Sequence, residues 1–94
     1  MPSAPSVPPS VAIWQLQSWL ATQPSLIAGH TGTMLSDANA VAAAAGPPVS
    51  LWWQALSAQA LRSDPGVANF AAQIGLTTSA QVDAMFIGAA AVVL

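Results

Sequence analysis

The chain has 94 residues, of which 54% are hydrophobic and 4% are charged, and its formal net charge is −2. A single cationic side chain excludes a nucleic-acid-binding surface, because neutralising phosphates requires clustered Lys and Arg. The lack of cysteine excludes disulfides and thiolate metal sites.

The scarcity of charge predicts a protein that works inside a larger assembly. Soluble domains ordinarily carry charge on roughly a quarter of their residues, which keeps their surfaces solvated and apart. A chain this short buries only about 60–65% of the surface that its unfolded form exposes. We therefore expect apolar side chains to contact other protein subunits, including copies of this chain.

Residues 1–10 predict an extended or disordered Pro/Ser-rich arm, and residues 11–94 a single helical domain. The arm, MPSAPSVPPS, contains four prolines and three serines and has little to bury. Two interpretations remain open for it: a disordered tail, or an arm that becomes ordered by lying across a neighbouring subunit.

The first helix is expected over residues 11–22, with Ser10 as its N-cap and Pro24 preventing much continuation. One side of this helix carries the apolar residues Ile13, Leu16 and Leu20. Trp14 and Trp19 project from other sides, so apolar residues cover most of the circumference. Such a helix is generally surrounded by other protein.

Residues 24–35 mix glycines, threonines and a histidine, and predict a loop or a short irregular ribbon. An Ala-rich helix is expected over residues 38–45, capped by Ser36 or Asp37 and ended by Gly46. Residues 38–61 carry no charge and are long enough to span a membrane, but Pro47 and Pro48 interrupt them. Two short helices therefore fit this stretch better than one long span.

The clearest helical periodicity follows, and it predicts a helix over residues 48–63. Its apolar positions are spaced as on one helix face: Val49, Trp52, Trp53, Leu56 and Ala60. Asp64 and Pro65 are an N-cap and a first helical residue, and they open a short helix with an apolar stripe of Val67, Phe70, Ala71 and Ile74. Gly75 and Leu76 predict a Schellman motif at its end.

Thr78 and Gln81 have the spacing of a capping box and begin the last helix. Its apolar side is expected to carry Val82, Met85, Phe86, Ala89 and Val93. Residues 84–94 are too short to span a bilayer and too apolar to remain in water. Gly88 and the alanines that follow it would let another helix approach closely. Together these elements predict an all-α fold, a compact bundle of about five short helices.

The sequence offers little that could support catalysis. His30 is the one candidate general base, and no G-x-S-x-G motif accompanies it. A histidine in a glycine-containing loop is typical of a turn or of a structural hydrogen bond, and Asp37 and Asp64 are interpreted as helix caps. We therefore predict no enzyme activity, no catalytic residues, no metal site and no cofactor.

The four tryptophans have several possible roles. They could stack on a ligand or lie at a membrane interface, but a core or protein-interface role is favoured for large aromatic side chains. The candidate interface residues are Trp14, Trp19, Trp52, Trp53, Met85, Phe86, Ile87, Val92, Val93 and Leu94.

One stretch of the chain resembles part of a known class of proteins. The residues GLTT at 75–78 and AQVDAMF at 80–86, before an alanine run, resemble the C-terminal helix of small Ala-rich proteins encoded in bacteriophage structural gene clusters. The similarity covers about 20 residues. It implies a virion component, such as a minor capsid, cement, head-completion or tail protein, and it carries no catalytic residues.

Three functions are therefore compatible with the sequence. The leading hypothesis is a non-enzymatic structural subunit of a large multi-copy assembly, such as a virion. The second is a small helical subunit of a membrane protein complex, with the last helix and the tryptophans against lipid or transmembrane partners. The third is a soluble binding module that uses the Trp52-Trp53 face for a peptide or hydrophobic ligand.

Overall fold

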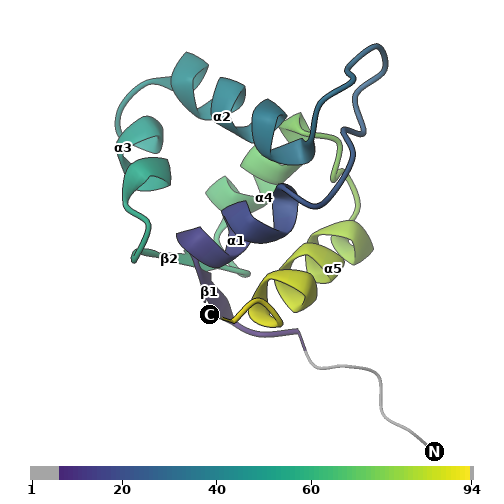
Figure 1. The fold of residues 1–94 in the computed structure, drawn as a ribbon. Helices are drawn as coiled ribbons and strands as arrows, with labels where there is room; N and C mark the ends of the chain where they lie inside the picture. Colours follow the sequence, from purple (N-terminus) through teal and green to yellow (C-terminus); the bar gives the residue numbers. More distant parts are fainter. Residues whose placement is uncertain (1–6, 94) are drawn as a thin grey trace, which may run out of the picture.

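Five helices and a two-stranded sheet form the described part of this computed structural model, residues 7–93 (Figure 1). Residues 1–6 and Leu94 lie outside the described residues. The elements, in chain order, are β1 (Ser10–Ala12), α1 (Ile13–Leu20), α2 (Met34–Ala45), α3 (Val49–Gln54), β2 (Gln59–Leu61), α4 (Pro65–Gln73) and α5 (Ser79–Ala90). The prediction of about five helices is confirmed, whereas a purely all-α fold is wrong because of the sheet.

The helices α1 and α5 pack along one another and form much of the core (Figure 1). The predicted apolar stripe of α1, Ile13, Leu16 and Leu20, is buried, as are Val82, Met85, Phe86 and Ala89 of α5. A Cβ atom on Gly88 would lie 2.1 Å from Nε1 of Trp19. The small residue therefore admits the Trp19 side chain of α1, so the helix that approaches α5 belongs to the same chain.

The predicted ends of α4 are confirmed. Asp64 is its N-cap, and the Asp64 carboxylate accepts a hydrogen bond from the amide of Gly66 at 2.8 Å. At the other end Gly75 has a φ of +101°, which favours glycine. The Gly75 amide donates to the carbonyl of Ala72 at 3.2 Å and the Leu76 amide to that of Ala71 at 3.0 Å. These two bonds define the Schellman motif.

The start of α5 is also confirmed as a capping box. The hydroxyl of Thr78 accepts a hydrogen bond from the Gln81 amide at 3.2 Å, and the Thr78 amide donates to Oε1 of Gln81 at 3.0 Å. At the C-terminal end of α5, the side chain of Gln15 donates to the carbonyl of Val92 at 3.1 Å. Both ends of α5 are thus tied down within this chain.

The predicted helix over residues 48–63 is wrong after Gln54. The chain turns at residues 55–58 and then forms β2, which pairs with β1 in antiparallel register, Val11 opposite Ala60. The carbonyls of Leu56 and Ala58 accept hydrogen bonds from the first two amides of α1, at 3.0 and 2.9 Å. A helix that continued through these residues would lose both the strand pairing and this cap on α1.

The same strand pairing corrects the expected start of the first helix. Ser10 lies in β1 and is not an N-cap, and α1 begins at Ile13. Arm residues 7–9 are also anchored: Val7 packs against the core, and the carbonyl of Pro9 accepts from the Arg62 amide at 2.9 Å. The remainder of the predicted arm, residues 1–6, lies outside the described residues.

The helix α2 begins earlier than predicted, at Met34. Its N-cap is Thr33, whose hydroxyl accepts from the amide of Ser36 at 3.3 Å. Neither Ser36 nor Asp37 is the cap, and Asp37 lies buried in the first turn. The predicted end at Gly46 is confirmed, with a φ of +70°.

Candidate functional site

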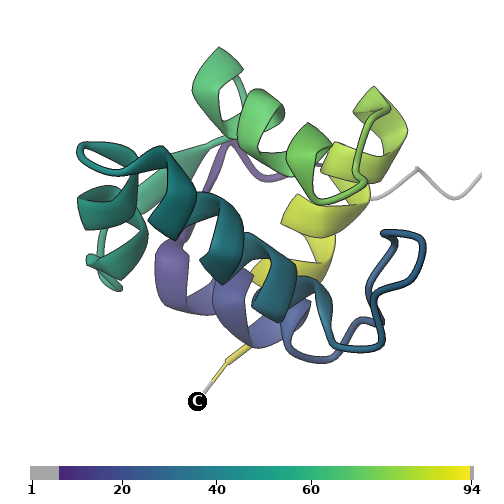
Figure 2. The same ribbon diagram turned by 90° about the horizontal axis from the view of Figure 1, so that it is seen from above.

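An open groove of about 360 Å³ lies between α2, α3 and α4. Figure 2 shows these three helices next to one another. Val41 and Ala45 of α2 line one side, and Val67 and Phe70 of α4 line the opposite side. Trp52 of α3 completes the apolar lining. A volume of this size is at the small end of the range for ligand-binding cavities, roughly 300–1,000 Å³.

Two aromatic side chains, Trp52 and Phe70, line this groove, and the buried Trp53 packs against both of them. Phe70 meets the ring of Trp52 edge to face, with centroids 5.9 Å apart at 77°, and lies 4.9 Å from the ring of Trp53. Trp53 is buried and its indole N–H donates to Oδ1 of Asn39 at 2.8 Å. Because Trp53 is fixed from behind, Trp52 and Phe70 keep a defined arrangement at the groove.

Polar groups stand along the α4 side of the groove. Asp64, Asn69 and Gln73 all line it, and Asn69 and Gln73 are exposed and one helical turn apart. Their amide groups carry N–H donors that a bound molecule could use. The groove thus combines aromatic surface with a row of hydrogen-bond donors.

The Trp52-Trp53 face expected from the sequence is divided in the structure. Trp53 belongs to the core, whereas Trp52 is half-buried and lines the groove. Residues such as Val41 and Asn69 could not be assigned to this site from the sequence, because three separate helices bring them together. The sequence did indicate two of the lining residues, because Trp52 lies on the apolar face of one predicted helix and Phe70 in the apolar stripe of the next.

The other candidate interface residues differ in how far they can reach a partner. Met85 and Phe86 are buried in the core of this chain, so their side chains present no contact surface. Trp14, Trp19, Ile87 and Val92 are half-buried, and Val93 is 79% exposed. Leu94 lies outside the described residues.

Sequence reasoning missed a group of exposed leucines on α3, the following turn and β2. Leu51, Leu56 and Leu61 are 62%, 51% and 49% exposed. The helix expected over residues 48–63 placed Leu56 on its buried face, so the exposure could not be anticipated. These leucines belong to residues 38–61, which contain no charged side chain.

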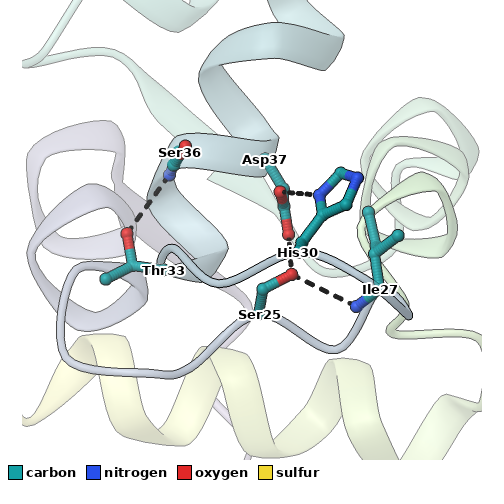
Figure 3. Close-up of polar contacts among 6 residues, drawn as sticks. All are labelled: Ser25, Ile27, His30, Thr33, Ser36 and Asp37. Atoms are coloured by element: carbon teal, nitrogen blue, oxygen red, sulfur yellow. Dashed lines mark hydrogen bonds and ion pairs between the residues drawn. The ribbon is translucent and has the colours of Figure 1, made fainter.

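A polar cluster joins the loop before α2 to the first turn of that helix (Figure 3). Asp37, only 5% exposed, accepts a hydrogen bond from the hydroxyl of Ser25 and lies 2.7 Å from Nδ1 of His30. The His30 nitrogen donates, because an ionised carboxylate can only accept. These two contacts, the Ser25 bond first, hold the pKa of Asp37 below its ordinary value of 3.8.

The order of groups in this cluster does not suit nucleophilic catalysis. In a serine hydrolase the imidazole lies between the hydroxyl and the carboxylate and removes the hydroxyl proton. Here the carboxylate of Asp37 lies in the middle, and Ser25 gives its hydrogen bond to that carboxylate and not to His30. The arrangement fastens the loop to α2, in line with the structural role expected for His30.

All four charged side chains contact another group of this chain. The Asp37 carboxylate contacts His30 of the loop before α2, and the Asp64 carboxylate accepts from the Gly66 amide of α4. Arg62 pairs with Asp83 at 2.6 Å and also donates to the hydroxyl of Ser79 at 3.0 Å. Each charge therefore already has a local partner.

Among residues 7–93, no three His, Cys, Asp or Glu side chains come together as metal ligands would. Within the same residues, no helix combines the length and apolar character needed to cross a membrane. Comparisons with protein-family models, with curated proteins and with solved structures gave no match.

Proposed function

We propose that this chain is a non-enzymatic structural subunit that associates with copies of itself in a large assembly. A virion is the kind of assembly that the resemblance of the last helix implies. The contact surface of this proposal is the exposed apolar part of residues 51–61, which belongs to α3, the turn after it and β2.

The observation that carries the proposal is the exposure of Leu51, Leu56 and Leu61 in a stretch without charge. The three leucines lie within residues 51–61, and exposed apolar side chains that form one contiguous patch are typical of protein-interaction surfaces. Arg62 and Asp83 form an ion pair and the formal net charge is only −2, so little electrostatic repulsion would oppose association of like chains. Full burial of one leucine contributes about 1.5–3 kcal/mol, and each of these leucines, about half exposed in the single chain, would add part of that to an interface.

The test is sedimentation velocity of the full chain over a wide concentration range. We expect the sedimentation coefficient to rise with concentration. A variant carrying Leu51→Ser and Leu56→Ser should associate at least tenfold more weakly, because about 1.4 kcal/mol already changes an equilibrium constant tenfold. Val93→Ser is the matched control, since Val93 is exposed and apolar but lies after α5.

Circular dichroism of each variant checks that the fold is retained. A wild-type chain that stays monomeric at the highest soluble concentration would contradict the proposal. A second contrary result is association that Val93→Ser weakens and the leucine variant does not, because the contact surface would then be the end of α5.

A further inference from the structure

We infer that the groove between α2, α3 and α4 of one copy binds residues 2–6 of a second copy in the polyproline II conformation. The inference rests on the proposed function, because it names a segment through which copies of the chain associate. The segment bound in the aromatic groove is therefore the Pro-rich arm of a neighbouring copy.

The first argument is the spacing of prolines in the arm. Pro2 and Pro5 lie three positions apart. A polyproline II helix has three residues per turn, so in that conformation the two rings share one side. Its carbonyls form no internal hydrogen bonds and remain free to accept from a partner. The arm would therefore present apolar rings together with acceptors.

The second argument is that the groove offers the complementary groups. Pro-rich segments bind in grooves lined by aromatic side chains, and here Trp52 and Phe70 supply two rings at 77° to one another. Asn69 and Gln73 stand along the rim as donors for the free carbonyls of the arm. A polyproline II helix has no internal hydrogen bonds, so the donors for its carbonyls must come from the groove.

Charge is compatible with this pairing. Residues 1–9 carry no charged side chain, and α2 beyond Asp37 and all of α3 carry none either. Among the described residues, Asp64 is the one charged residue that lines the groove, and its carboxylate already accepts from the Gly66 amide at 2.8 Å. Docking of the arm therefore leaves no charge both buried and unpaired.

The third argument concerns direction, and it favours a second copy over the chain's own arm. Residues 7–9 lead away from α3 and toward the α5 side in both views (Figures 1 and 2). The bond from the Arg62 amide to the carbonyl of Pro9 and the packing of Val7 fix this course. An arm on one side and a groove on another make a head-to-tail contact, which repeats into a ring or a filament.

The experiment uses the full chain with Pro2→Ala and Pro5→Ala, so that its own arm does not compete, and a synthetic peptide of residues 1–10. The indole N–H resonance of Trp52 and the tryptophan fluorescence report binding. We expect saturable binding that shifts the Trp52 signal. A peptide with alanine at positions 2 and 5 should not saturate, because it lacks the two rings.

Asn69→Ala with Gln73→Ala should weaken peptide binding about tenfold, since each lost hydrogen bond is worth about 0.5–1.5 kcal/mol. Gln54→Ala is the matched control, because Gln54 is an exposed amide on α3 that does not line the groove. Equal binding of the alanine peptide, or binding that leaves the Trp52 signal unmoved, would overturn the inference.

Sedimentation of the wild-type chain and of the Pro2→Ala, Pro5→Ala chain separates this inference from the proposed function. We expect severalfold weaker self-association without the two prolines. If both chains associate equally and the peptide does not bind, the proposed function stands and the arm contact is wrong. If the peptide binds but the wild-type chain is monomeric, the arm occupies its own groove, which contradicts a second copy as the partner.

Discussion

Residues 62–93 and residues 34–61 of this chain are similar in length and in apolar content, yet the ends of the helices within them are determined differently. In the first region, α4 begins and ends, and α5 begins, on residues that supply local hydrogen bonds, such as Asp64 and Thr78. In the second region, α3 ends where the chain must reach β1, more than forty residues earlier in the sequence. Local side chains thus determine both ends of α4 and the start of α5, whereas pairing with a distant strand determines the end of α3.

The two regions also use their apolar side chains differently. In α5, Val82, Met85, Phe86 and Ala89 are all buried against the same chain. In residues 49–61, the apolar positions divide between the core, the groove and solvent, as Trp53, Trp52 and Leu51 show. The segment from α3 to β2, which has no local stop signal, is therefore also the segment with apolar surface left for partners.

The largest test of this comparison replaces one apolar residue in each region. Phe86→Ala should lower the free energy of unfolding by about 3–5 kcal/mol, because Phe86 is fully buried. Leu51→Ala should change it by no more than about 0.5 kcal/mol, because Leu51 is 62% exposed. Urea denaturation followed by circular dichroism, at a concentration where the chain is monomeric, measures both. A comparable loss in the two variants would erase the difference between the regions.

The next test asks whether the end of α4 is purely local. A Cβ atom on Gly75 would lie 2.7 Å from Cβ of Leu26, in the loop before α2, and its φ is +101°. Gly75→Ala should therefore cost about 2–4 kcal/mol, from left-handed strain and from the contact. Gly29→Ala is the control. The φ of Gly29 is +83°, but a Cβ atom there would meet no atom of the described residues within 4 Å, so the substitution should cost about 1–2 kcal/mol.

A Leu26→Ala background isolates the contact. There the cost of Gly75→Ala should fall toward that of Gly29→Ala, which a double-mutant cycle of unfolding free energies would show. An unchanged cost would mean that backbone strain alone enforces the end of α4, and that this helix end depends only on its own residues.

The fold could be predicted wherever a helix end is encoded in adjacent residues. Asp64, Gly75 and the Thr78 with Gln81 pair gave correct ends because each satisfies backbone groups within a few positions. The sheet could not be predicted, since three residues in each strand carry no distinctive pattern and Ala60 fits a helix as well as a strand. The end of α3 has neither glycine nor proline to mark it.

The groove was less predictable than the fold. The sequence identified Trp52 and Phe70 as prominent apolar residues, but it could not place α2, α3 and α4 around one space. It also could not show that Ser25, His30 and Asp37 would meet, because the sequence does not encode the path of the loop that carries Ser25 and His30. Both sites arise from the packing of distant segments, which local spacing does not encode.

A smaller test compares the N-caps of the two regions. Thr78→Ala should cost about 1 kcal/mol, because α5 then loses its side-chain cap and half of the reciprocal bonding with Gln81. Thr33→Ala should cost about half as much, since its bond to the Ser36 amide is longer, at 3.3 Å, and is not reciprocated by a Glu or Gln side chain. Thermal unfolding by circular dichroism measures both, and a larger loss for Thr33 would reverse the ranking of local signals.

The smallest expected effect is a pH dependence at the loop before α2. The Ser25 hydroxyl and His30 hold the pKa of Asp37 below 3.8, so the folded chain favours the ionised carboxylate more than the unfolded chain does. The resulting stabilisation is present above the unfolded value and is lost as the pH falls through the folded one. Because His30 is 51% exposed, water screens part of the interaction.

Asp37→Asn should therefore lower the unfolding midpoint at pH 7. The difference should shrink below pH 3.8 and vanish below the lower pKa of the folded state, where the wild-type carboxylate is also neutral. Ser25→Ala should reduce the pH dependence without abolishing it, since the His30 contact remains. A difference that stays constant from pH 7 into strong acid would show that Asp37 acts through packing alone. The loop would then be held to α2 by shape, and the charge of Asp37 would have no part in that attachment.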